Sequence, residues 1–159
     1  MKGTLRARVA GAAALLLLVG AIVGFLETGS KLVRKPVAWA DITSEVGAAR
    51  WARPTISIVK NQAKLGKLFE VALLPPRPRP PRVDFSRLEV ILVAVGPRSS
   101  TGYSLHVVRV TQSGNIDVLV RERTPALGEI VEPTITFPYL LLTVPKSGKH
   151  VSVKYAGRY

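Results

Sequence analysis

The sequence predicts an α+β protein in which an N-terminal transmembrane helix precedes a mainly antiparallel β domain of about six strands with one packed helix. Three observations lead to this prediction. An uncharged apolar run fills residues 9–26, an apolar stripe at helical spacing lies in residues 62–73, and from residue 83 onward β-patterned stretches alternate with turn-forming residues. A chain of 159 residues suffices for one such domain, which we expect to be a sandwich or a partial barrel.

The apolar run of residues 9–26 is long enough to cross a bilayer. As a helix it rises about 27 Å, close to the thickness of the hydrocarbon core. Cations precede it within residues 1–8, and the best small-x-small cleavage site, at residues 38–40, lies beyond a second basic stretch. We therefore predict that residues 1–35 form an uncleaved signal-anchor, with a cleaved signal peptide as the alternative.

The expected location is the cell membrane, with a single pass and the β domain outside the cytoplasm. An N-terminal apolar region of this kind most often directs export. The cations that follow the run nearly balance those that precede it, so charge asymmetry adds little to the choice of orientation. The absence of cysteine excludes thiol catalysis and thiolate metal sites.

The body of the chain is strongly basic. Residues 41–159 contain 17 Lys and Arg against 9 Asp and Glu, a formal net charge of +8. Such a surface attracts anionic lipid headgroups, acidic polymers or nucleic acid, or it simply keeps the protein soluble. Nucleic acid is the less favoured partner, because only one aromatic residue, Tyr103, is expected to share a strand face with Arg109.

The segment between the anchor and the β domain contains few periodic signals. Residues 36–54 are predicted to be a connecting segment, and the β-rich domain is predicted to span residues 55–159. Residues 55–60 alternate and are rich in β-branched side chains, which indicates a strand. Asn61 can then cap a helix over residues 62–73, in which the apolar side chains fall on one face.

The proline-rich run of residues 75–82 must end that helix, because proline removes a backbone donor and clashes with the preceding turn. The run should be extended and stiff. Its alternating arginines and prolines leave two interpretations open: a spacer, or a docking segment for a phosphate or a proline-recognising groove.

The central part of the chain predicts three strands. Residues 88–95 are almost continuously apolar, so we expect a central strand buried on both faces. Residues 102–110 alternate, placing Tyr103 and Arg109 on one face, and residues 115–123 return as the partner strand of a hairpin.

The last part of the chain predicts a second hairpin. A loop with a short strand at residues 134–137 leads into it. Residues 139–145 and 150–156 have strand patterning and are separated by a turn sequence, so we expect them to pair with each other.

The sequence contains no convincing catalytic constellation. His106 and His150 lack metal-ligand spacing, and the hydroxyls of Ser99, Ser100 and Thr101 do not stand in a nucleophile elbow. The carboxylates are scattered along the chain. We therefore expect no catalysis, no cofactor and no metal.

A set of short motifs resembles the PrcB C-terminal domain family over roughly residues 55–147. The motifs are Asp84-Phe85, Gly96 with Arg98, Thr101-Gly102-Tyr103, Pro125 with Gly128, and Pro138-Tyr139. The resemblance implies a non-catalytic role in the assembly or stability of an envelope protease. Ser100 stands where the family usually has glycine, the arginines among the prolines are unusual, and no lipobox cysteine is present.

The loop at residues 100–103 also resembles, more weakly, the loop that chagasin-type inhibitors insert into cysteine peptidases. That resemblance implies a peptidase inhibitor as a further alternative. The candidate partner-binding residues are Arg98, Ser99, Ser100, Thr101, Gly102 and Tyr103. The leading functional hypothesis is a membrane-anchored module that binds a protein partner, possibly a protease. A basic domain that binds anionic envelope polymer or nucleic acid is the alternative from another class.

Overall fold

The computed structural model describes residues 34–72 and 78–158. Residues Arg34–Tyr159 form one compact unit. The predicted anchor, residues 9–26, lies outside the described residues. Among the residues that are described, no helix has the length and apolar character needed to cross a membrane.

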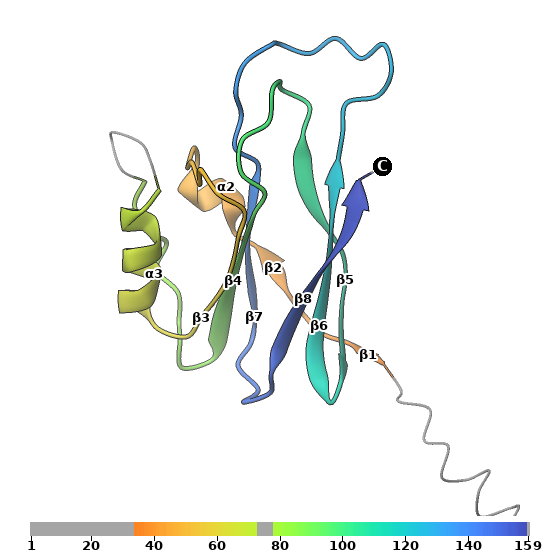
Figure 1. Ribbon diagram of the computed structural model, residues 1–159. Helices are drawn as coiled ribbons and strands as arrows, with labels where there is room; N and C mark the ends of the chain where they lie inside the picture. Colours follow the sequence, from red (N-terminus) through yellow and green to blue (C-terminus); the bar gives the residue numbers. More distant parts are fainter. Residues whose placement is uncertain (1–33, 73–77, 159) are drawn as a thin grey trace, which may run out of the picture. The chain divides into compact units, whose positions relative to one another are not determined.

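Two four-stranded sheets pack face to face and do not close into a barrel, so of the two predicted arrangements, sandwich or partial barrel, the described residues form the sandwich (Figure 1). The first sheet has the order β1 (Lys35–Pro36), β5 (Ser104–Ser113), β6 (Asn115–Arg123), β8 (Val151–Arg158). The second has the order β2 (Ala40–Asp41), β7 (Tyr139–Pro145), β4 (Leu88–Ala94), β3 (Thr55–Val59). Two helices accompany the second sheet, α2 (Thr43–Val46) and α3 (Gln62–Glu70).

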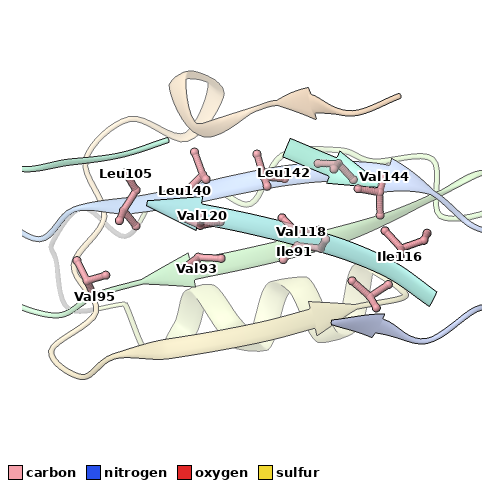
Figure 2. Close-up of a cluster of buried hydrophobic side chains, with 12 residues drawn as sticks. Ile91, Val93, Val95, Leu105, Ile116, Val118, Val120, Leu140, Leu142 and Val144 are labelled. Atoms are coloured by element: carbon pink, nitrogen blue, oxygen red, sulfur yellow. The ribbon is translucent and has the colours of Figure 1, made fainter. Parts of the chain in front are cut away.

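The central strand β4 is buried on both faces, as predicted. Its odd-numbered side chains, such as Ile91 and Val93, enter the core between the two sheets, where Figure 2 shows them facing Val118 and Val120 of β6. Its even-numbered side chains, such as Leu92, enter a second core. Successive side chains of a strand point to opposite faces, so a strand with a core on each side is apolar at nearly every position; in β4 the exception is the buried Glu89.

Helix α3 covers the outer face of the second sheet and forms the second core. The side chain of Asn61 accepts a hydrogen bond from the backbone N–H of Lys64 at 2.8 Å, which confirms the predicted N-cap. Leu65 and Phe69 are buried against the sheet. The helix ends at Glu70, three residues before the predicted end at residue 73.

The segment predicted as a connection contributes directly to this second core. The ring of Trp51 is buried, with its centroid 5.7 Å from that of Phe69 and 4.8 Å from that of Tyr139. The Tyr139 hydroxyl donates to the backbone oxygen of Gly47 at 2.6 Å, and burial raises the pKa of Tyr139 to about 12. Residues 35–51 thus supply β1, β2, α2 and a core tryptophan to the sandwich.

The predicted hairpin of residues 139–145 and 150–156 is wrong. Strand β7 pairs with β4 and β2 in the second sheet, whereas β8 crosses to the first sheet and pairs with β6 in parallel. The reason is that β7 is apolar on both faces and must lie between two cores. Strand β8 contributes Val151 to the core between the sheets and contributes no residue to the second core. The turn between the two strands therefore changes sheets.

Two other details of the β pattern also differ from prediction. The register of β5 and β6 shifts between Val107 and Arg109, so the extra residue Val108 interrupts the alternation and Arg109 no longer shares a face with Tyr103. The predicted strand at residues 134–137 is reduced to a single bridge, between Thr136 and Arg98.

The part of the proline-rich run that is described is fixed to α3. The side-chain amide of Gln62 donates to the backbone oxygen of Pro81 at 3.0 Å, and the same side chain accepts from the backbone N–H of Val83 at 3.4 Å. This end of the run therefore lies against the domain.

Candidate functional site

The loop of residues 96–103 leaves β4 at one end of the sandwich. Gly96 begins it with a φ of +76°, and a β-carbon there would lie 3.3 Å from the Cδ of Pro54. The backbone of Arg98 then exchanges two hydrogen bonds with that of Thr136, at 2.8 and 2.9 Å. The loop is thereby fixed at both its start and its middle.

The side chain of Arg98 points into the domain. Its guanidinium makes two hydrogen bonds to the carboxylate of Glu122, one of them at 3.1 Å, and a third to the backbone oxygen of Val95 at 3.0 Å. The Tyr155 hydroxyl donates to the same carboxylate. Glu122 is completely buried, and the pKa of Arg98 is raised because the carboxylate accepts its hydrogen bonds. This polar cluster of Arg98, Glu122 and Tyr155 joins the two sheets.

The next residues of the loop contact the long loop of residues 124–138. The backbone N–H of Thr101 donates to the backbone oxygen of Glu132 at 3.0 Å, and the backbone N–H of Glu132 donates to the Thr101 hydroxyl at 2.9 Å. The Thr136 hydroxyl donates to the backbone oxygen of Ser100 at 2.8 Å. The two loops therefore behave as one hydrogen-bonded unit.

Gly102 is the position in this unit where glycine is required. Its φ is +89°, and a β-carbon there would lie 3.0 Å from the Cγ1 of Val131 and 3.1 Å from the Cγ of Pro125. We expect Gly102→Ala to lower the free energy of unfolding by about 1–2 kcal/mol from backbone strain alone, with the close contacts adding to the loss. Urea denaturation measures this.

Gly128→Ala is the matched control for that measurement. Gly128 has a similar φ of +82°, but a β-carbon there meets nothing within 4 Å. Gly102→Ala should therefore cost more than Gly128→Ala; equal losses would contradict the packing of the two loops.

The six candidate residues do not share one exposed face. Arg98 is held inside the domain, Thr101 and Gly102 are partly buried against the neighbouring loop, and Ser100 and Tyr103 are half-buried. Ser99 alone among the six is exposed. The loop of residues 96–103 therefore supports the loop of residues 124–138 through these hydrogen bonds.

An ion pair holds the supported loop in shape. The guanidinium of Arg123 donates to both carboxylate oxygens of Glu129, at 2.8 and 2.7 Å, and to the backbone oxygen of Gly102 at 2.8 Å. The backbone N–H of Ala126 donates to the same carboxylate at 2.8 Å. The pKa of Glu129 is lowered, first by the hydrogen bond from Arg123 and then by that from Ala126, so the carboxylate is ionised at neutral pH.

This loop exposes the large apolar side chains of Leu127, Ile130 and Ile135. We call Leu127 and Ile130, which lie at the turn of residues 126–129, the apolar tip. Leu127 and Ile130 are fully exposed. Exposed large apolar side chains on a well-held loop are typical of contact sites. The sequence prediction did not include Leu127, Ile130 and Ile135, because they follow neither helix nor strand periodicity. The signal that could have indicated them is the presence of leucine and isoleucine in a stretch without strand alternation.

The apolar tip and the start of the described chain lie at opposite ends of the sandwich (Figure 1). Lys35 pairs with Gln112, next to the turn between β5 and β6. The loop of residues 124–138 begins at the far end of β6, which at nine residues is roughly 27 Å long.

Comparison with known families agrees with the motif resemblance. The family described as PrcB C-terminal matches residues 90–145. The match extends from β4 to the end of β7 and includes both loops of the candidate site. No curated protein and no solved structure matches the chain.

Proposed function

We propose that this chain, whose residues 90–145 match the PrcB C-terminal family, is a non-catalytic accessory module that binds a protein partner and assists the assembly or stability of an envelope protease. The family match is consistent with an accessory module of a protease complex. In the proposal, residues 9–26 anchor the protein in the cell membrane and the sandwich lies outside the cytoplasm.

The apolar tip is the observation that carries the binding role. Leu127 and Ile130 lie in water in the isolated chain, although burying a side chain of this size stabilises a contact by about 1.5–3 kcal/mol. The Arg123–Glu129 ion pair and the neighbouring loop order the tip before it binds, which lowers the entropy lost on association.

The proposal assigns the apolar tip to the protein partner. Leu127 and Ile130 are exposed on a loop that the Arg123–Glu129 ion pair and the hydrogen bonds to the loop of residues 96–103 hold in place.

The test is co-purification from the native membrane. The wild-type chain should co-purify with a protease, and the double variant Leu127→Ser, Ile130→Ser should lose most of it, with an expected drop of about tenfold or more in recovered partner. Thermal unfolding of the double variant should match that of the wild type, because both side chains are exposed.

Val108→Ser is the matched control, because Val108 is an exposed apolar residue on β5, away from the tip. It should leave recovery unchanged. Recovery of a protease by wild type and double variant alike would overturn the assignment of the tip. Loss of the partner on a modest rise in salt would instead favour the alternative of electrostatic binding to an anionic polymer.

The inhibitor alternative has its own test. It requires the loop of residues 96–103 to enter a peptidase cleft, and Tyr103→Ala should then relieve inhibition of a cysteine peptidase. If cysteine and serine peptidases keep full activity with the wild-type protein present, inhibition is excluded.

A further inference from the structure

We infer that the outer edge of β3, which pairs with no further strand among the described residues, binds an extended segment of a protein partner as an added strand. The inference goes beyond the proposed function by assigning a second contact surface, and it rests on that function only in taking the ligand to be a protein. Strand β3 is the last strand of its sheet, pairing with β4 through five consecutive residues without a register shift. Residues Thr55–Val59 carry no charge. A regular uncharged edge is a template for another strand.

The first supporting observation is a cavity of about 460 Å³ on the inner side of this edge. Its walls include Ile56 of β3, Val93 and Val95 of β4 and Tyr155 of β8. Ile56 remains 54% exposed even though it lies on the face that forms the inter-sheet core further along the strand. Within the part of the chain that the structure describes, the sandwich is therefore open between β3 and β8 at this cavity.

The second observation is a cavity of about 260 Å³ on the helix side of the same edge. Trp51, Arg53 and the exposed Val71 line it, and Thr55 lines both cavities. Consecutive side chains of a strand point to opposite faces. An added strand beside Thr55 would thus place one side chain in the larger cavity and the next in the smaller one.

The charges near the edge indicate the chemistry of the segment. Arg98 in the larger cavity already pairs with Glu122, and Lys60 lies 3.8 Å from the buried carboxylate of Glu89. The exposed Arg53 lines the smaller cavity. An extended segment with adjacent apolar residues and a nearby carboxylate fits these groups and the basic surface of the body.

A second copy of the chain fits the edge less well. Two antiparallel β3 strands would bring Arg53 of one copy near Lys60 of the other at both ends of the pair, and each copy adds its own excess of positive charge. Strand β8 is the weaker template on the same side of the sandwich, because it carries Lys154 and its pairing with β6 shifts in register.

The test selects peptides from a phage-displayed random library on the full-length chain. Binders should be enriched in adjacent apolar residues beside Asp or Glu. Ile56→Arg should weaken them by about tenfold to a hundredfold, and Val71→Arg should weaken them independently. Val108→Arg is the control with an exposed apolar residue elsewhere, and matched circular dichroism melts confirm that every variant folds. A selection that yields no peptide distinguishing wild type from Ile56→Arg overturns the inference.

Strand addition is then tested on the backbone of the best peptide. Alternate amides of an added strand face β3 and the others face solvent. Of two versions N-methylated on alternate residues, one should bind like the parent and the other should lose about tenfold or more. The inference fails if the two versions bind alike, or if the chain sediments as a dimer that Ile56→Arg dissociates. The tip variants Leu127→Ser and Ile130→Ser should bind these peptides normally, so the two surfaces can fail separately.

Discussion

Arg98→Ala should destabilise the domain by about 3–5 kcal/mol, because it leaves the fully buried carboxylate of Glu122 without its bidentate partner. The Tyr155 hydroxyl cannot neutralise that charge. The measurement is the free energy of unfolding from urea denaturation, followed by circular dichroism. A double variant, Arg98→Met with Glu122→Leu, should recover much of the loss, because it removes the buried charge and keeps the volume filled.

Arg109→Ala is the control for this prediction. Arg109 is an exposed arginine on β5 of the first sheet, and its removal should change stability by no more than about 0.5 kcal/mol. If Arg98→Ala behaves like Arg109→Ala, the polar cluster does not join the sheets in solution. If the double variant is less stable than Arg98→Ala, the buried charge is not the cause of the loss.

Trp51→Ala should cost about 3–5 kcal/mol, because it removes a buried ring that packs on Phe69 and Tyr139 and leaves a cavity between the helix and the sheet. The same urea experiment measures it. Loss of the ring should also expose Tyr139 to water and lower its pKa toward 10, which an ultraviolet titration of the phenol can follow.

Trp39→Ala is the matched control, because Trp39 lies in the same stretch of chain but is 43% exposed. Trp39→Ala should lower the free energy of unfolding far less than Trp51→Ala. If Trp51→Ala lowered the free energy of unfolding only slightly, residues 36–54 would be a connecting segment that does not stabilise the core.

The parts of the fold that could be predicted are those in which one local signal suffices. Strand β4 is apolar at almost every position, which is possible only between two cores, and Asn61 followed by an apolar stripe specifies the start of α3. The partner of β8 could not be predicted. Its alternation marks a strand, but the choice between β7 and β6 depends on which sheet has an open edge, and that is a property of the whole fold.

In the candidate site, too, some features could be predicted from local sequence and others depend on the whole fold. Glycines at 96 and 102 mark a loop, and both do adopt positive φ. Glu122 continues the alternation of Ile116, Val118 and Val120 along β6, so the strand itself turns it inward. That Arg98 lies opposite it depends on how the two sheets pack, which no local pattern specifies. The apolar tip has no periodic pattern in the sequence. Its exposure depends on how the two loops are held together by the hydrogen bonds of Thr101, Glu132 and Thr136, which no local pattern specifies.

The parallel pairing of β8 with β6 bears on the order in which the protein folds. Strand β8 follows every other strand along the chain, yet Val151 contributes to the inter-sheet core and Tyr155 completes the polar cluster at Glu122. Non-local pairing of this kind forms late and slowly. During synthesis, the first sheet is therefore completed only when the final strand has been made, and until then the edge of β6 is the surface that a chaperone would need to protect.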